Sequence, residues 1–539
     1  MFCPKCGTVL EEGAVFCGNC GSQLDAVDTA VETVADTVVQ QPKQTTGGIA
    51  GDKIASLLAS LQQMDLRKLI ILAAALVVVV IAVVVTVNII TPDKYVYTKG
   101  TVYISQGEDS VVVIPHGKAT TRVDGTLVNS ARSLDGTVAV MLVNEDNNYS
   151  SDGYALYLVT DTSRLVSDGV HSYWLAASGD AVAYTKERDT NEGTEELWLY
   201  TGGNNTRISR AFSVNYRRCA ISPDGKTLAF VTVDGDRHTG VVWDGQTHNI
   251  NRDSWPIAIA NGARYVYYVR DDVLFVQRGT SGDNRERLGE SVSSLHFNRD
   301  YSQVVYAADG RDYLSVRGGR GERLSGRVQR FLMPHGAATQ ALSFGTVYGI
   351  SAFADSFYIN QDSAVVYLDS KLETNSVARN AEGVTLARDG KTILFLRNRS
   401  IYTVNGKNSN AEPTEIVDER VAQFIATADG KAVFFINSND EIYHQKGKGR
   451  PTQVADFFST RNISGLGYGL FKGNSLFYIS DEELYQSSGN RGERVRGIEG
   501  RVQSVSAGMF SVTVTAVDGR DTLYYRSTDG SRFELVRQE

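Results

Sequence analysis

A turn motif that recurs about every forty residues constrains the fold of this 539-residue chain more than any other feature. The motif is Asp-Gly or a close variant followed by four or five apolar residues, and its clearest copies begin at Ser222, Arg388 and Ala428. Successive turns are 38 to 45 residues apart, with one double step of 89; they fall near positions 135, 180, 224, 262, 300, 389, 429 and 473. Glycine suits these turns because a tight hairpin needs a positive φ.

A period near forty with hairpin turns is typical of the four-stranded blades of a β-propeller. A later strand of each unit often carries an aromatic residue, which we expect to pack between blades; examples are Trp198, Tyr402, Tyr443 and Tyr485. Sandwich arrays do not repeat at this spacing, and the coils of a β-helix are shorter. We therefore predict a mainly β fold for residues 95–539. The nine or ten expected units form one large β-propeller or two in tandem.

The segment Leu69–Ile90 contains twenty-two residues without a charge. At about 1.5 Å per residue a helix of this length spans roughly 33 Å, which is enough to cross a bilayer. The alternative is a buried core helix or strand, but buried strands run only about 4 to 8 residues. The segment lies too far from the N-terminus and is too long for a cleaved signal peptide. We predict a single transmembrane helix over residues 69–90.

Four of the five cysteines lie in the first twenty residues, as two C-x-x-C-G pairs formed by Cys3, Cys6, Cys17 and Cys20. This pattern suits one tetrahedral Zn²⁺, and since all four positions are thiols the site is predicted to be structural. Two disulfides or a redox pair are the alternatives, but a redox C-x-x-C normally sits in a βαβ unit. We predict a zinc ribbon over residues 1–24. The fifth, Cys219, is expected to be a buried, inert thiol.

Two parts of the chain resemble known families. Residues 1–24 resemble the short zinc ribbons found at the N-termini of many bacterial membrane proteins, with all four ligand positions present. The Ser-Pro-Asp-Gly-Lys run at Ser222–Lys226 resembles the blade signature of TolB-type and WD-like propellers, and this resemblance spans about residues 95–539. The resemblance implies a bacterial membrane protein with a propeller as its large C-terminal domain.

Residues 25–68 read as a flexible linker whose last part carries an apolar stripe at Ile54, Leu57, Leu58 and Leu61. The stripe fits either a juxtamembrane helix on the membrane surface or an extension of the span. Three basic residues precede the span closely and two follow it, which is a thin margin for the positive-inside rule. Zinc thiolates persist in a reducing cytosol. We therefore predict a cytoplasmic N-terminus and an extracytoplasmic C-terminal domain.

Charge and motifs exclude several function classes. The net charge of −8 does not fit a nucleic-acid partner. There is no G-x-S-x-G nucleophile elbow. The segment from Asp146 to Asp152 resembles the start of a calcium loop but lacks its glycine and bidentate glutamate, so a polar hairpin loop is the preferred interpretation. None of the seven histidines has a metal-ligand spacing: His116, His171, His238, His248, His296, His335 and His444. We assign no catalytic or cofactor-binding residue.

These observations predict a single-pass membrane protein that binds rather than catalyses. Its extracytoplasmic propeller would recognise a protein or cell-envelope ligand, and its only cofactor would be the structural zinc ion in the cytosol. One alternative is a propeller hydrolase or lyase that acts on an envelope polymer. Another is a transmembrane sensor that recruits a cytosolic partner through the zinc ribbon.

Overall fold

The computed structural model describes residues 95–539 apart from 108, 146–152, 283, 340–346, 349–350, 419 and 457–467. The chain divides into two compact units, Met1–Ile90 and Thr91–Glu539. The predicted zinc ribbon, linker and transmembrane helix lie outside the described residues. Within the described part, no helix is long and apolar enough to cross a membrane.

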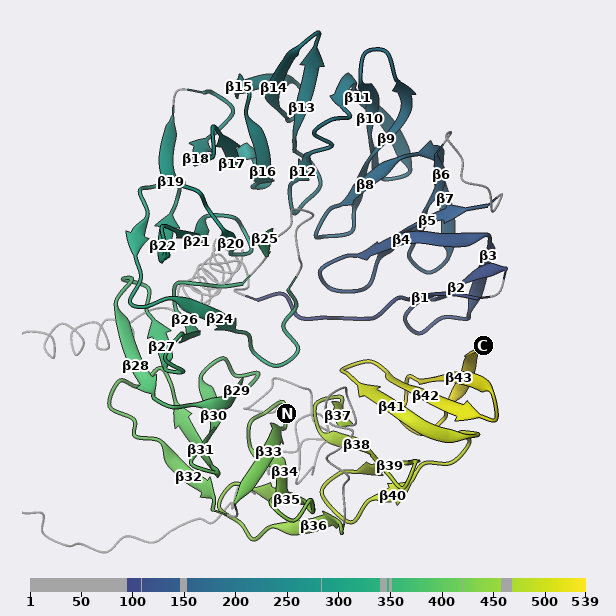
Figure 1. Cartoon of the computed structure of the whole chain (residues 1–539), viewed down its shortest axis with the longest axis vertical. Helices are drawn as coiled ribbons and strands as arrows, with labels where there is room; N and C mark the ends of the chain where they lie inside the picture. The colour runs from purple at the N-terminus through teal and green to yellow at the C-terminus, as the bar shows by residue number, and fades with distance from the viewer. Residues whose placement is uncertain are drawn as a thin grey trace, which may run out of the picture. The chain divides into compact units, whose positions relative to one another are not determined.

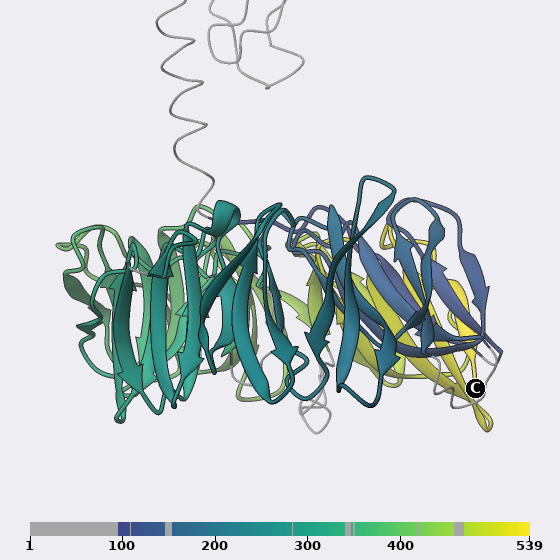
Figure 2. The same cartoon turned by 90° about the horizontal axis from the view of Figure 1, so that it is seen from above.

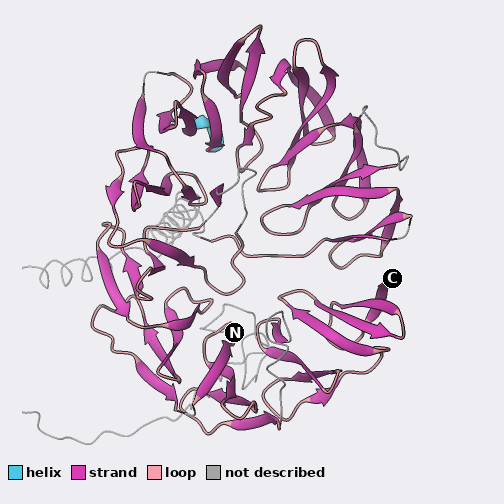
Figure 3. Ribbon diagram, in the orientation of Figure 1, coloured by secondary structure: helices cyan, strands magenta, loops and turns pink. Residues whose placement is uncertain are grey.

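The described residues are mainly β, as predicted, and their only helix is the 3₁₀ turn η1 (Asn261–Ala263). The strands form ten sheets, one of which has eight strands (Figure 3). That sheet joins two four-stranded units through one residue pair, Phe212 and Thr232, so ten sheets contain eleven blades. The repeat in the sequence predicts nine or ten units, which is fewer than the eleven blades. The repeat gives too low a number because the first and last blades lack the turn motif. Figure 1 shows the blades following one another around a ring.

The strands are assigned to blades in chain order. Blade 1 contains β1 (Tyr103–Gln106), β2 (Ser110–Ile114) and β3 (Thr121–Asp124). Blade 2 contains β4 (Thr126–Arg132), β5 (Ala139–Asn144), β6 (Tyr154–Val159) and β7 (Ser163–Val170). Blade 3 contains β8 (Ser172–Leu175), β9 (Ala181–Asp189), β10 (Thr194–Thr201) and β11 (Asn204–Ser213). Blade 4 contains β12 (Cys219–Ile221), β13 (Leu228–Asp234), β14 (Arg237–Trp243) and β15 (Thr247–Arg252). Blade 5 contains β16 (Trp255–Ile259), β17 (Tyr265–Arg270), β18 (Val273–Arg278) and β19 (Arg285–Glu290). Blade 6 contains β20 (Ser294–Phe297), β21 (Gln303–Ala308), β22 (Arg311–Val316) and β23 (Glu322–Arg323).

Blade 7 contains β24 (Val328–Leu332), β26 (Ser356–Asn360), β27 (Val365–Leu368) and β28 (Thr374–Ala378). Blade 8 contains β29 (Glu382–Leu386), β30 (Thr392–Arg397), β31 (Ser400–Asn405) and β32 (Thr414–Val417). Blade 9 contains β33 (Val421–Ala426), β34 (Ala432–Asn437), β35 (Ile442–Lys446) and β36 (Thr452–Ala455). Blades 10 and 11 contain β37 (Tyr468–Phe471), β38 (Ser475–Ser480), β39 (Glu483–Ser487), β40 (Glu493–Arg494); and β41 (Arg501–Ala507), β42 (Val512–Asp518), β43 (Asp521–Ser527), β44 (Glu534–Gln538).

Each four-stranded blade is an antiparallel meander, which gives the ring two distinct faces (Figure 2). The connections between first and second strands and between third and fourth strands lie on one face, which we call the turn face. The connections between second and third strands and from one blade to the next lie on the other, which we call the loop face. All eight turns predicted from the repeat lie between the first and second strands of a blade. Blade 1 differs, because its three strands lack an inner partner for β1.

The aspartates of the repeated turns hold the turns together. The carboxylate of Asp135 accepts hydrogen bonds from the backbone and hydroxyl of Thr137 and from the hydroxyl of Ser133. Partial burial by itself would raise the pKa of Asp135, but these hydrogen bonds outweigh burial and lower the pKa. The pKa values of Asp389 and Asp429 are lowered in the same way. These acids therefore stabilise turns and are not free for chemistry.

Backbone hydrogen bonds also join the turns of successive blades. Five turns donate an N–H to a carbonyl of the next turn, with N···O distances of 2.8 to 3.2 Å; the pairs are Leu134 to Ala177, Ser178 to Pro223, Arg388 to Ala428, Ala428 to Gly473 and Lys472 to Gly508. Because these bonds link neighbouring blades, the turn face is a continuous hydrogen-bonded rim over much of the ring.

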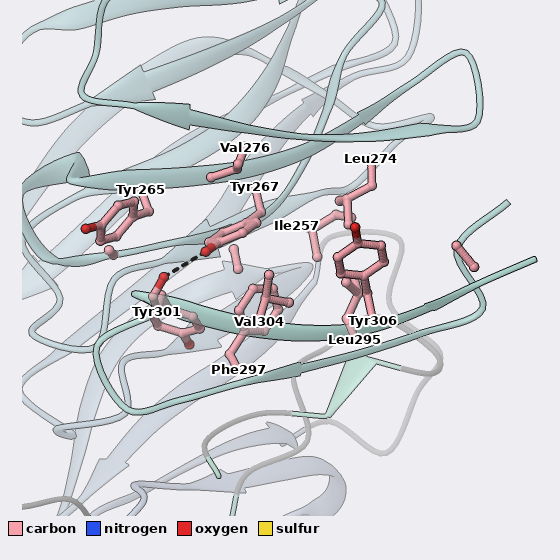
Figure 4. Packing of buried hydrophobic residues seen from close by; sticks show 13 residues of the cluster. Ile257, Tyr265, Tyr267, Leu274, Val276, Leu295, Phe297, Tyr301, Val304 and Tyr306 are labelled. Atoms are coloured by element: carbon pink, nitrogen blue, oxygen red, sulfur yellow. Dashed lines mark hydrogen bonds between the residues drawn. The ribbon is translucent and has the colours of Figure 1, made fainter. Parts of the chain in front are cut away.

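The hydrophobic core is divided into ten clusters, each shared by two blades that are consecutive in the chain. Figure 4 shows the cluster between blades 5 and 6, where the Tyr267 hydroxyl donates a 2.9 Å hydrogen bond to the carbonyl of Tyr301. Phe297 lies beside both rings and is fully buried. Blade-to-blade burial of apolar side chains therefore fixes the order of the blades.

Aromatic residues of the third strands stack first on their own blade. The rings of Tyr402, Tyr443 and Tyr485 lie 5.5 to 5.7 Å from an aromatic ring of the neighbouring second strand, and the planes are within 18 to 19° of parallel. Each also packs against a cluster shared with the preceding blade. These three residues therefore pack between blades, as expected, and they also stack within their own blade.

The turn of blade 7 is replaced by an insertion from Met333 to Asp355, where the repeat predicts a degenerate turn near residue 345. Within it, β25 (Val347–Tyr348) pairs in parallel with β20 and so extends blade 6 on its inner edge. The insertion therefore reaches into the centre of the ring.

The chain enters the ring along the turn face. The segment Tyr95–Gly100 runs from the insertion to β1 across the ring (Figure 1). The backbone N–H of Thr98 donates to the carbonyl of Gly336 at 3.1 Å, and that of Lys99 donates to Asp135 in the turn of blade 2 at 2.8 Å. Because both acceptors belong to connections on the turn face, the first residues of the ring lie on that face.

Candidate binding site on the loop face

The structure does not reach the predicted metal ligands. Cys3, Cys6, Cys17 and Cys20 lie outside the described residues, as does the segment from Asp146 to Asp152. The part of the chain that is described contains no group of three or more His, Cys, Asp or Glu side chains arranged to hold a metal ion. Cys219 is buried on β12, and burial raises the pKa of its thiol.

The loop face of blades 3 to 5 carries a cluster of three aromatic rings, which we call the aromatic cluster: Tyr216, His238 and Trp255. The rings of Tyr216 and Trp255 are stacked, with centroids 3.9 Å apart and planes 21° from parallel. The His238 ring meets Tyr216 edge-on at 4.6 Å. All three side chains are half-buried, so their remaining surface is available to a ligand.

Different connections bring these side chains together. Tyr216 lies in the linker between β11 and β12, His238 near the start of β14, and Trp255 is the first residue of β16. Each of these positions is at the loop-face end of its blade, so the fold collects residues whose successive spacings in the chain are 22 and 17 positions.

An ion pair with a buried carboxylate holds the linker in place. The Arg217 guanidinium lies 3.2 Å from the carboxylate of Glu195 on β10; this carboxylate is fully buried, whereas 42% of the Arg217 side chain is exposed. The Arg217 N–H also donates to the carbonyl of Ser213 at 3.0 Å. The second carboxylate oxygen of Glu195 has no hydrogen-bond partner among the described residues. Because a buried carboxylate needs its counter-charge, Glu195 fixes the position of Arg217, the residue that follows Tyr216 in the chain.

The aromatic cluster and Arg217 present the side chains that dominate binding energy in protein interfaces, namely Trp, Tyr and Arg. The stacked rings are rigid and lose little conformational entropy on contact. The guanidinium keeps donors available to a ligand, since a guanidinium carries five N–H groups. The arrangement therefore suits recognition of a surface through stacking and hydrogen bonding.

Sequence reasoning missed this site. The run from Tyr216 to Ile221 predicts an inner strand around Cys219, and β12 confirms that strand. The candidate site, however, lies in Tyr216 and Arg217 before this strand and in His238 and Trp255 further along the chain. The one indication available in the sequence was the position of these residues in the repeat. Each lies in or directly after a connection at the end of the strands that is away from the repeated Asp-Gly turns.

Residues 2–24 match the zinc-ribbon domain family. No curated protein sequence matches the chain. Among solved structures, the tricorn protease aligns over 81% of this chain and 58% of its own at 9% identity and a TM-score of 0.29. TolB from Acinetobacter baumannii aligns over 51% of this chain and 78% of its own, at 13% identity and a TM-score of 0.27. A eukaryotic initiation factor aligns over 66% of this chain and 95% of its own, at 9% identity and a TM-score of 0.38. The tricorn alignment thus spans less than two thirds of that protein.

Proposed function

We propose that this chain is a membrane-anchored, non-catalytic binding protein of the bacterial envelope. Its ring of blades recognises a protein or cell-envelope ligand, and the aromatic cluster favours a protein. The observation that carries this proposal is the stacked Tyr216–Trp255 pair on the loop face, with the partly exposed Arg217 next to Tyr216 in the chain. Trp, Tyr and Arg anchors of this kind are enriched where a few residues supply most of the affinity.

The position of the aromatic cluster supports an anchored arrangement. The cluster lies on the loop face, whereas the segment Tyr95–Gly100 enters on the turn face. A partner on the loop face therefore leaves the segment Tyr95–Gly100 uncovered. In this proposal residues 69–90 span the membrane once, the N-terminus is cytoplasmic and the ring is extracytoplasmic.

We further propose that Cys3, Cys6, Cys17 and Cys20 hold one structural zinc ion. The donor set fits, because four thiolates without an open position are typical of structural zinc sites, and zinc binding supplies the folding energy of so small a unit. Metal analysis of the purified full chain is expected to give one zinc ion per molecule. A Cys3→Ser, Cys6→Ser variant is expected to lose it, whereas Cys219→Ser keeps it because Cys219 is buried on β12. Full zinc content in the double variant would contradict the assignment.

The binding proposal is tested on intact cells with a membrane-impermeant cross-linker. We expect the wild-type chain to form a cross-linked adduct with a partner, and Trp255→Ala or Tyr216→Ala to reduce the adduct at least tenfold. Loss of one hot-spot side chain costs about 2 kcal/mol or more, which is about thirtyfold in affinity.

Leu165→Ala is the matched control, because Leu165 is apolar and 45% exposed but lies on β7, away from the cluster. This variant should retain the adduct. An adduct that survives in both aromatic variants would refute the site. If the ring is reached by the reagent only after the cells are opened, the extracytoplasmic location is wrong.

A further inference from the structure

The two faces of the ring carry opposite charge at blades 8 to 10. The turn-face connections of these three blades contain eight basic and three acidic residues, whereas their loop-face connections contain four basic and eight acidic residues. The turn face is therefore positive here and the loop face negative, by +5 and −4. A protein with faces of opposite sign is oriented by the field of a charged surface.

Seven exposed residues on the turn face of blades 8 to 10 form a group that we call the basic patch. The eighth basic residue of these connections, Arg491, is left out because it pairs at 2.7 Å with Asp456, which directly follows β36 at its loop-face end. The basic patch consists of Arg388, Lys391, Lys407, Lys431, Lys448, Arg450 and Lys472.

Backbone hydrogen bonds hold the parts of the basic patch against one another. The N–H of Gly406 donates to the carbonyl of Lys391 at 2.9 Å, which joins the two turn-face connections of blade 8. The N–H of Gly447 donates to the carbonyl of Lys431 at 3.0 Å, which does the same in blade 9. The bonds of the rim described above link the turns of blades 8, 9 and 10. The seven residues therefore belong to one continuous surface.

The most basic connection of the patch joins β35 to β36. Residues 446–450 read Lys-Gly-Lys-Gly-Arg, with three cations and no acid, and all five are exposed. Gly447 has a φ of 52°, and the N–H of Gly449 donates to the carbonyl of Lys446 at 3.0 Å. The two glycines leave no side chain between the three cations, so an anionic group can approach the backbone N–H groups as well as the charges.

The acids of the same connections are largely engaged within their own turns. The carboxylates of Asp389 and Asp429 accept hydrogen bonds from the backbone N–H groups of the turns that contain them. Lys407 has a close acid, Asp355 at 3.1 Å. Among the ion pairs of the described residues, none involves Lys448. The charge of the basic patch is therefore balanced only in part by the protein itself.

The first described residues of the ring pack on the basic patch. The Arg388 guanidinium lies 5.1 Å from the centre of the Tyr97 ring, and the Tyr97 hydroxyl donates to the Arg388 carbonyl at 3.4 Å. Tyr97 also forms an antiparallel bridge with Ala337 of the insertion. Four residues, 91–94, separate Tyr95 from the predicted span that ends at Ile90. In a membrane-anchored chain, the part of the ring that the chain reaches first after the span is thus beside the basic patch.

We propose that the basic patch binds the anionic lipid headgroups of the membrane that anchors the chain. The inference rests on the proposed function for its anchor, but it concerns a different surface from the aromatic cluster. Each Lys or Arg near an anionic membrane surface adds to the attraction, which acts within a Debye length of about 8–10 Å at physiological salt. The same membrane repels the acidic loop face, so the aromatic cluster stays accessible to its ligand.

The test follows the acetylation of individual lysines by mass spectrometry. The full chain is reconstituted into lipid discs of phosphatidylcholine alone, or of phosphatidylcholine mixed with anionic phosphatidylglycerol. We expect Lys431 and Lys448 to react several-fold more slowly in the anionic discs, and the difference to disappear at high salt because the attraction is screened. Lys186, near the loop-face end of β9, is the internal control and should react equally in both discs.

A charge-reversal variant shows whether the basic patch itself makes the contact. Lys448→Glu, Arg450→Glu is expected to abolish the difference at Lys431. Arg399→Glu, Arg420→Glu is the matched control, because it reverses two exposed charges in the loop-face connections that follow β30 and β32, and it should retain the difference. Equal reactivity of Lys431 in the two discs for the wild-type chain would overturn the proposal, as would a difference that persists in the Lys448, Arg450 variant.

Alkaline extraction of the discs separates this proposal from the proposed function. An inserted chain whose lysines react alike in both discs contradicts lipid binding by the basic patch and leaves the anchor intact. A chain that alkali releases contradicts the anchor. If that released chain sediments with phosphatidylglycerol vesicles and the Lys448, Arg450 variant does not, the basic patch stands without the anchor; if the released chain does not sediment, both proposals fail.

Discussion

Replacing Phe297 with alanine is expected to lower the free energy of unfolding by about 3–5 kcal/mol. Phe297 is fully buried at the end of β20 and lies between two tyrosine rings, 4.8 Å from Tyr267 and 5.1 Å from Tyr301 (Figure 4). The surrounding backbone is fixed by two blades at once, so the cavity cannot easily collapse. Because each cluster holds two blades together, the substitution also weakens the junction between blades 5 and 6.

Chemical denaturation of the full chain, followed by tyrosine and tryptophan fluorescence, measures this effect. Val128→Ala is the control, because Val128 is 44% exposed on β4, and surface substitutions usually change stability by less than about 0.5 kcal/mol. A loss below about 1 kcal/mol for Phe297→Ala would show that the blades do not depend on this cluster.

Alanine at Gly430 is expected to destabilise the ring more than alanine at Gly390, although both glycines occupy the same place in the repeated turn. Their φ angles are nearly identical, 68° and 67°, so the cost of placing a Cβ at positive φ, about 1–2 kcal/mol, applies equally. A Cβ at Gly430 would lie 2.8 Å from the Cβ of Ala387 in the preceding blade, whereas a Cβ at Gly390 meets nothing within 4 Å. Overpacking at Gly430 adds about 1–3 kcal/mol.

The comparison isolates blade packing from turn conformation, because Gly390→Ala serves as the conformational control for Gly430→Ala. The difference between their denaturation midpoints, converted with a common m-value, is the quantity to compare. Equal destabilisation would mean that the turns of blades 8 and 9 are not in close contact. The double variant Gly430→Ala, Ala387→Gly is expected to recover the overpacking part.

The junction between blade 1 and blade 11, which we call the seam, differs from the junctions between consecutive blades. Packing of consecutive blades is apolar throughout the ten shared clusters, and the seam alone relies on Arg526 and its neighbours. Blade 1 also lacks an inner strand, so the last blade is not interlocked with the first by a shared sheet. The seam is therefore the junction that none of the shared apolar clusters closes in the described ring.

The sequence by itself determined the repeating unit of this protein. Each Asp-Gly turn, such as Asp224–Gly225, folds with local hydrogen bonds and a positive φ, and both requirements are visible in neighbouring residues. The apolar strands that follow each turn are likewise local. The same reasoning applies to the cysteine pairs near the N-terminus, whose spacing identifies them without a structure.

Only the tertiary structure decided the number of blades, the seam and the aromatic cluster. Blade 1 has only three strands and lacks the turn motif, and blade 11 has no Asp-Gly between its first two strands, so the repeat undercounts the blades. Tyr216 meets Trp255 because neighbouring blades pack side by side. Tyr103 meets Arg526, which is near the other end of the chain, because the last blade closes the ring against the first. Local hydrogen bonding and periodicity are encoded within a few residues, whereas contacts between blades depend on the packing of the whole ring.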